Sequence, residues 1–204
     1  VPLGTLAAVR HRSALGVVVT AVSQVGVAIP AFLAGIALVT VFAVMLRWLP
    51  ANGWTPPSAD PAMFVKQLIL PALSLGAVQG AVLTRYVRSA VLDVLREDYI
   101  RTARAKGLTP VRALVRHGLR NAAIPVVTVL GLQLATLLIG AVVIERVFVI
   151  PGLGSLLLDA VRTRDLIVVQ DVVMLLVLAV LVVNYLVDLL YLAIDPRLRT
   201  GEVR

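Results

Sequence analysis

Four long apolar stretches limit what this chain can fold into. They lie at about Ala14 to Leu46, Gln67 to Thr84, Ala122 to Ile144 and Val172 to Ile194. A helix needs roughly 20 apolar residues to cross a bilayer, and each stretch is near or above that length. The chain is also 60% hydrophobic and only 15% charged over its 204 residues, a composition typical of integral membrane proteins. We therefore expect an all-α membrane protein with four complete spans, because helices satisfy their own backbone hydrogen bonds in lipid.

The amino-terminal stretches raise two structural expectations. The first apolar stretch is too long for one straight crossing at about 1.5 Å per residue, and Pro30 lies near its middle. We expect a kink or a break there. The segment Val1 to Val9 is apolar and carries no initiator Met, charged leader or signal-peptide cleavage site. We expect it to be the tail of a membrane helix whose beginning is missing, so that the domain is N-terminally truncated.

The uneven distribution of lysine and arginine predicts the orientation of the chain. Fourteen of the 19 basic residues fall before the first span, between Arg85 and Arg120, or after the last span. The last group consists of Arg197, Arg199 and Arg204. The other five basic residues share the opposite side with carboxylates. By the positive-inside rule, both termini and the central loop are cytoplasmic.

The net charge of +8 is explained by this asymmetry. Nucleic-acid binding is not expected, because the basic side chains are not interleaved with stacking aromatic residues. Contact with membrane lipid headgroups is expected of any such surface.

The polar loop between the second and third spans predicts a helix, a turn and a second helix. Glu97 and Arg101 have the favourable i,i+4 order in the first helix. Gly107 is expected to break that helix, Thr109 is a good N-cap, and Pro110 suits the first position of the next helix. The second helix carries an apolar stripe beside a row of arginines. The stripe is Val111, Leu114, Val115 and Leu119, and the row is Arg112, Arg116 and Arg120. Such a helix can lie along a membrane surface or can simply connect two spans.

The residue order in this loop is more specific than its charge. The string DYIRTARAKGLTP, followed by RHGLRNAAIP, resembles the conserved cytoplasmic loop of permease subunits from binding-protein-dependent ABC importers, in the dipeptide and oligopeptide branch. The resemblance continues through PLGTLAAVR, GVAIPAFLAGIAL, WLPANGW, VFVIPGLGSLLLDAV, RDLIVVQ and VDLLYLAIDPRLR. It implies a multi-span helical bundle over residues 1–204 like a type I ABC importer transmembrane domain. The cytoplasmic coupling loop would lie at about 93–120 and an outer loop at about 145–170.

The resemblance also implies a function and a set of partners. In this family the loop forms a coupling helix that fits into a groove on a separate ATPase subunit. The residues that match, here named the coupling motif, are Arg101, Thr102, Ala103, Arg104, Ala105, Lys106 and Gly107. The wider superfamily has Glu-Ala-Ala ahead of the glycine, and the Arg-Thr-Ala found here is usual in the peptide branch.

The implied protein is a permease subunit of an ATP-driven importer for di/oligopeptides or similar small solutes in a bacterial or archaeal inner membrane. Its partners would be a second permease subunit, two ATPase subunits or domains, and an extracytoplasmic substrate-binding protein.

The sequence shows no set of His, Cys, Ser and carboxylate residues arranged for nucleophilic or metal catalysis. It has no GxxxxGK[ST] phosphate loop, no cysteine, and only His11 and His117 as histidines. We therefore expect no enzyme activity, metal or cofactor, with ATP hydrolysis on the partner subunits. The alternative is an ion-coupled secondary transporter or channel subunit without an ATPase. That class would need inverted repeats or midplane ionisable groups, and neither is clear in the sequence.

Polar and small residues inside the spans give three further expectations. Asp188 is the one acid well inside a span and is a candidate intramembrane polar site, for which we expect a structural role near the cytoplasmic boundary. Gly131 and Gly140 give the third span a small-residue face that should meet other helices. On the outer side, the Pro151–Gly152 turn should precede a short amphipathic helix at residues 155–161.

Overall fold

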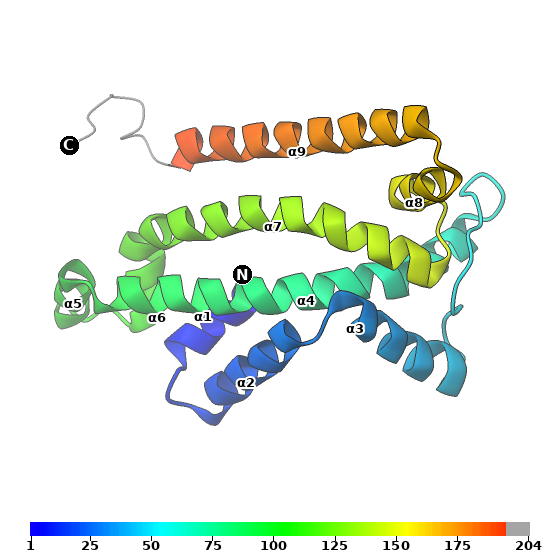
Figure 1. Ribbon diagram of the computed structural model, residues 1–204. Coiled ribbons are helices and arrows are strands. Elements are labelled where there is room, and N and C mark those ends of the chain that lie inside the picture. The colour runs from blue at the N-terminus through cyan, green and yellow to red at the C-terminus, as the bar shows by residue number, and fades with distance from the viewer. Residues whose placement is uncertain (195–204) are drawn as a thin grey trace. The chain divides into compact units, whose positions relative to one another are not determined.

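The computed structural model describes residues 1–194, apart from the side chains of Ala135 and residues 191–194. Every regular element in that part of the chain is a helix (Figure 1), which confirms the all-α prediction. The helices are α1 (Pro2–Val9), α2 (Ala14–Ala28), α3 (Ala31–Leu38), α4 (Pro61–Arg96), α5 (Asp98–Ala105), α6 (Pro110–Ala113), α7 (Leu119–Phe148), α8 (Leu153–Thr163) and α9 (Leu166–Ile194). Two π-helical segments, Val39–Met45 and Leu114–Gly118, follow α3 and α6.

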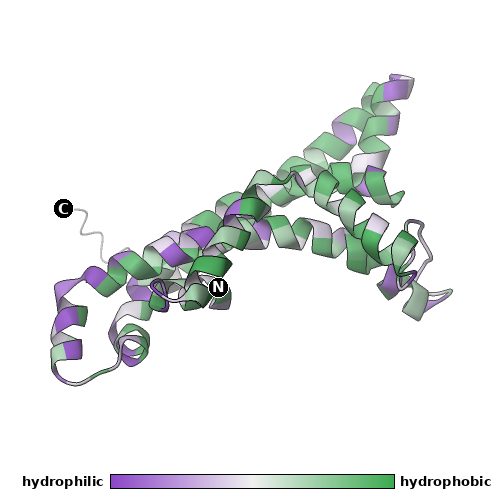
Figure 2. Ribbon diagram, turned by 90° about the horizontal axis from the view of Figure 1, so that it is seen from below, coloured by the Kyte–Doolittle hydropathy of each residue, from purple (hydrophilic) through white to green (hydrophobic). Residues whose placement is uncertain are grey.

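Three helical segments within residues 1–194 are long and apolar enough to cross a membrane. They are Pro61–Arg96, Pro110–Phe148 and Leu166–Leu190. A fourth candidate is the bent pair Ala14–Ala28 and Ala31–Met45, if the two pieces count as one span. Figure 2 shows hydrophobic residues along these long helices. Several helices extend beyond the apolar stretches, because a helix that leaves the hydrocarbon can continue with charged residues on its surface.

Pro30 ends one helix and starts the next. Helix α2 stops at Ala28, and Pro30 has extended backbone angles (φ −60°, ψ 143°) as the N-cap of α3. This confirms the expected break. Pro71 and Pro125, in contrast, lie inside α4 and α7 without ending them. Interior prolines are tolerated in membrane helices when neighbouring groups satisfy the freed carbonyls.

The chain divides into two compact units. One comprises Val1–Val27, Gly80–Gln133 and the described part of Val182–Arg204, and the other comprises Ala28–Gln79 and Leu134–Leu181. The core of the first unit joins α1, α4, α5, the helix that starts at Pro110, and α7. Its buried residues are Ala8, Val87, Ala90, Val91, Val94, Ile100, Ala103, Ala113, Leu114, Ala122 and Val126.

Small residues bring α1 onto α4 in the first unit. Ala7 and Ala8 are completely buried. A Cβ added to Gly4 would lie 2.7 Å from the carbonyl oxygen of Thr84 and from Cβ of Val87. Backbones that approach this closely gain dispersion contacts, which are a main source of helix association in membranes.

The core of the second unit is centred on Phe148 at the end of α7. Phe148 packs with Leu70 of α4 and Ile144, and all three are almost fully buried. Gly35 of α3 makes room for the phenyl ring, because a Cβ there would lie 3.1 Å from Cε2 of Phe148. The buried hydroxyl of Ser74 donates to the carbonyl oxygen of Leu70 at 2.6 Å, so this buried polar group has a hydrogen-bond partner.

The small-residue face of α7 meets other helices, as expected from the sequence. In the first unit a Cβ on Gly131 would lie 2.9 Å from Cγ1 of Val187 in α9. In the second unit a Cβ on Gly140 would lie 3.2 Å from Cδ2 of Leu75 in α4. Both glycines therefore lie against a neighbouring helix.

Candidate coupling site

The predicted helix, turn and helix are present between α4 and α7. Helix α5 ends at Ala105, and Gly107 takes a positive φ of 92° that L-residues rarely adopt. The backbone N–H of Leu108 reaches back to the carbonyl oxygen of Ala103 at 3.3 Å, which satisfies one of the last carbonyls of α5. Thr109 is the N-cap of α6, its Oγ1 accepts from the backbone N–H of Arg112 at 3.4 Å, and Pro110 occupies the first turn. The predicted roles of Gly107, Thr109 and Pro110 are confirmed.

Glu97 and Arg101 do not share a helix, contrary to the i,i+4 spacing expected from the sequence. Glu97 has extended backbone angles and is the N-cap residue of α5, which begins at Asp98. Arg101 instead pairs with Asp98, with 3.3 Å between Nη1 and Oδ1. Spacing alone could not locate the first residue of α5, and a shift of one residue changes the partner. Both side chains are exposed, so the pair adds little stability.

The second helix is longer than the sequence pattern indicated. It runs without a break from Pro110 to Phe148, over 39 residues, so it is not a separate surface helix that precedes the span. Leu114 is buried in the core, whereas Val111, Val115 and Leu119 are exposed. The π-helical segment Leu114–Gly118 has more residues per turn than an α-helix. The 3.6-residue period used to assign the stripe therefore does not hold there.

The coupling motif has one buried residue and six exposed residues. Ala103 is buried in the first unit's core, where Ile100 of the same helix is completely buried. Arg101, Thr102, Arg104, Ala105, Lys106 and Gly107 are exposed. Two core residues on one face thus hold α5 against the ends of the longer helices, while the rest of the motif is accessible.

Two further contacts fix α5 in place. A Cβ on Gly118 would lie 2.6 Å from Cγ1 of Val94 and 3.3 Å from Cδ1 of Ile100, so the chain after α6 passes close to α4 and α5. Nδ2 of Asn121 also donates to the hydroxyl of Tyr99 at 2.9 Å. This pair could not be predicted from the sequence, because its members are 22 residues apart and no local pattern connects them.

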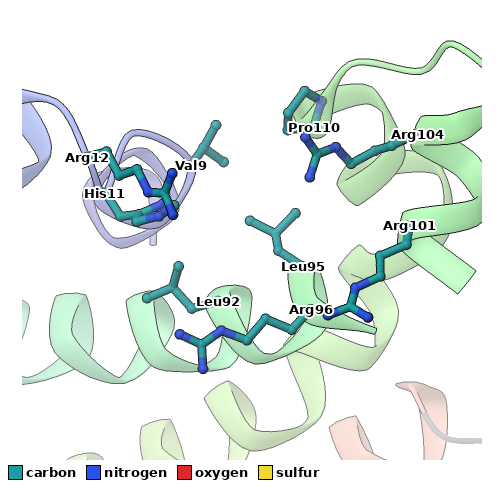
Figure 3. Close-up of a pocket in the computed structure, with 9 residues that line it drawn as sticks. All are labelled: Val9, His11, Arg12, Leu92, Leu95, Arg96, Arg101, Arg104 and Pro110. Carbon is teal, nitrogen blue, oxygen red and sulfur yellow. The ribbon is translucent and has the colours of Figure 1, made fainter. Parts of the chain in front are cut away.

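A basic pocket lies beside α5 in the first unit (Figure 3). Its volume is about 430 Å³. Its lining residues are Val9, His11, Arg12, Leu92, Leu95, Arg96, Arg101, Arg104 and Pro110. Two arginines of the coupling motif thus share a cavity with arginines from the α1–α2 turn and from the end of α4. In the sequence these charges indicate the topology, but no local pattern places them around one cavity.

Asp188 is not part of this arrangement. It lies on α9 with an exposed side chain and is not among the residues that line the basic pocket. No three His, Asp or Glu side chains gather within residues 1–194 in a way that could hold a metal ion.

The end of α7 at Phe148 is followed by the predicted turn and short helix. Helix α8 begins after Gly152, and its first-turn N–H at Ser155 donates to Oε2 of Glu145 at 2.9 Å. Arg146 pairs with Asp159 and also donates to the carbonyl oxygen of Ser155 at 3.0 Å. The turn-and-helix prediction at residues 155–161 is confirmed. The two residues of α7 that anchor α8 were not identified from the sequence.

Long apolar helices define a multi-span membrane protein, and a short basic helix and a turn connect two of them. A family described as binding-protein-dependent transport system inner membrane component matches residues 1–200. The chain belongs to that family, which confirms the family resemblance noted in the sequence.

Curated relatives are similar over most of this chain. It is 44% identical, over 96% of its length, to the di/tripeptide transport system permease protein DppB of Pseudomonas aeruginosa (strain UCBPP-PA14), and the match covers 64% of that protein. It is 48% identical, over 85% of its length, to the glutathione transport system permease protein GsiC of Escherichia coli (strain K12), and covers 54% of it. GsiC of Pectobacterium atrosepticum is 49% identical over the same share. The chain thus spans between 54% and 64% of the length of these relatives.

Proposed function

We propose that this chain forms the transmembrane part of a permease subunit in an ATP-driven importer of di/oligopeptides or similar small solutes. Support comes from family membership and from relatives named for di/tripeptide and glutathione transport. The proposed spans are residues 14–46, 67–84, 122–144 and 172–194. The proposed coupling loop is 93–120 and the proposed outer loop is 145–170.

The observation that best supports the coupling role is that one face of α5 is buried in the core while the other face is exposed. Ile100 and Ala103 fix one face of this short helix in the core, and the positive φ of Gly107 ends it sharply. Small and polar side chains remain accessible at Thr102, Ala105 and Lys106. A small residue on an exposed, rigidly held helix lets a partner approach closely. We assign this accessible face to the groove of a separate ATPase subunit.

The same core can transmit a movement of α5 to the membrane helices. Val94 of α4, Ile100 of α5 and Leu114 of the following helix are buried together. A close-packed interior resists compression, so a displacement of α5 moves the ends of α4 and α7 with it. The partners would be two ATPase subunits or domains, a second permease subunit and an extracytoplasmic binding protein. ATP-driven closure of the ATPase pair would then bias two conformations of the membrane helices.

The proposed orientation places both termini and α5 in the cytoplasm of a bacterial or archaeal cell, with the protein in the inner membrane. The basic residues around α5 support it. Arg197, Arg199 and Arg204, which contribute to the same argument, lie outside the described residues.

A cysteine cross-link tests the coupling role, since this chain contains no cysteine. Ala105→Cys in the full-length subunit, expressed with its partner subunits, should cross-link to an ATPase that carries a cysteine in its groove. The yield should change when nucleotide binds. Ser58→Cys is the matched control, because it is equally exposed but precedes α4 at its other end. Equal cross-linking at both positions, or none at Ala105, contradicts the assignment.

Transport energetics separate the proposal from an ion-coupled transporter or channel. Uptake into vesicles that contain the complete complex should stop when ATP is withheld and should continue when a protonophore collapses the ion gradient. The reverse pattern would favour the alternative and would leave the exposed face of α5 without an ATPase to bind.

A further inference from the structure

The basic pocket beside α5 collects positive charge from three separate segments. Arg12 comes from the turn between α1 and α2, Arg96 from the last turn of α4, and Arg101 and Arg104 from α5 (Figure 3). His11 is the only other titratable residue among the lining residues. No carboxylate lines the pocket.

The arginines of this pocket are poorly compensated. Within residues 1–194 no hydrogen bond or ion pair is found for the guanidinium groups of Arg12, Arg96 and Arg104. Arg101 pairs only with the exposed Asp98. Guanidinium groups that gather without counter-charges around a cavity focus a positive potential there. Each guanidinium group can also donate two parallel N–H hydrogen bonds to two oxygens of one phosphate. The pocket therefore favours a phosphate-bearing anion.

Part of the pocket lining is apolar. Val9 of α1, Leu92 and Leu95 of α4, and Pro110 contribute to its lining. Two residues after Arg12, the apolar helix α2 begins, and its Leu15, Val17 and Val18 are exposed. A ligand with a phosphate at one end and hydrocarbon at the other matches this combination. Free phosphate and a nucleic-acid backbone match it less well, because they have no hydrocarbon chain to contact the apolar lining.

We propose that the pocket binds the phosphodiester headgroup of an anionic phospholipid, with the acyl chains against the exposed apolar side chains of α2. This proposal goes beyond the importer function. It needs a membrane surface next to the pocket, but it does not depend on an ATPase. Because Arg101 and Arg104 belong to the coupling motif, a lipid bound there would contact α5 on the side away from Thr102.

Lipid retention by the full-length subunit tests the proposal. The subunit is purified from bilayers of phosphatidylcholine and phosphatidylglycerol, and bound lipids are counted by native mass spectrometry. Arg12→Gln/Arg96→Gln removes two charges of the pocket and leaves the coupling motif unchanged. We expect this variant to retain phosphatidylglycerol about tenfold less well than the wild type, with phosphatidylcholine unaffected.

The control variant is Arg112→Gln/Arg116→Gln, which removes the same charge from exposed residues that do not line the pocket. Full retention by this variant supports a defined site, whereas an equal loss means diffuse attraction and overturns the proposal. Displacement of phosphatidylglycerol by inorganic phosphate at equal concentration would also overturn it, in favour of a small-anion site. If Arg12→Gln/Arg96→Gln keeps its lipid but loses the ATPase in lipid-free detergent, the pocket is a protein-docking site and the proposal fails.

Discussion

The backbone N–H of Ser155 donates a hydrogen bond to Oε2 of Glu145 at 2.9 Å. Ser155 lies in the first turn of α8, where backbone N–H groups lack partners within the helix. A carboxylate near the end of α7 therefore caps a helix that begins eight residues later in the chain, at Leu153. Gly152 is essential to this contact, because a Cβ there would lie 2.2 Å from Cδ of Glu145.

Removing this cap should loosen α8. Glu145→Ala deletes the acceptor, and loss of an N-terminal cap costs about 1 kcal/mol. We expect faster hydrogen–deuterium exchange of the first-turn amides of α8 in the full-length protein, with little change in α9. Glu145→Gln keeps an acceptor oxygen in place and should retain most of the protection. Unchanged exchange in Glu145→Ala would show that the contact with Arg146 holds α8 alone.

Two alanines of the coupling motif should respond differently to enlargement. Ala103 is buried, and Ala103→Leu should overpack the core at a cost of about 1–3 kcal/mol. The thermal unfolding midpoint of the purified subunit should fall. Ala105 is exposed, so Ala105→Leu should leave that midpoint within error and weaken association with the ATPase. Equal midpoints for both variants would contradict the assignment of Ala103 to the core.

A side chain at Gly107 should act through the backbone. No atom lies within 4 Å of a Cβ added there, but the φ of 92° is strained for any L-residue. Gly107→Val should distort the turn and reduce co-purification of the ATPase, while membrane insertion persists. Gly107→Asn is the matched control, since asparagine tolerates positive φ better than a β-branched residue. Normal co-purification of the valine variant would count against the coupling role of this turn.

Asp188 should not be needed for transport. Its side chain is exposed on α9 and does not line the basic pocket. We expect Asp188→Asn to insert, assemble and transport at close to the wild-type rate. Loss of uptake by a variant that still assembles with its partners would refute the structural role and would make this carboxylate part of the pathway.

Local chemistry explains why much of the fold could be predicted from the sequence. Proline and glycine act within one or two residues, so the break at Pro30 and the turn at Gly107 were both predicted correctly. The N-cap at Thr109 follows from the same short-range rules. The glycines of α7 were correctly expected to face other helices, because a residue without a side chain permits close approach wherever the partner lies.

The rest depends on contacts between distant residues. The bond between Tyr99 and Asn121 connects different helices and leaves no periodic signal. The basic pocket likewise joins Arg12 to Arg96 across more than 80 positions in the sequence. Placing Glu97 inside the same helix as Arg101 was wrong for a local reason. A sequence pattern rarely locates the first residue of a helix to within one position, and α5 starts at Asp98.

Because the helix runs without a break from Pro110 into α7, no flexible linker separates the turn at Gly107 from the apolar part of that helix. Each residue advances an α-helix by about 100° of rotation and 1.5 Å of rise. Inserting a single residue after Pro110 would therefore turn the following part of α7 by more than a quarter of a revolution against α4, and Ala122 and Val126 would leave the core they share with Val94. The number of residues in this segment therefore determines which face of α7 packs against α4.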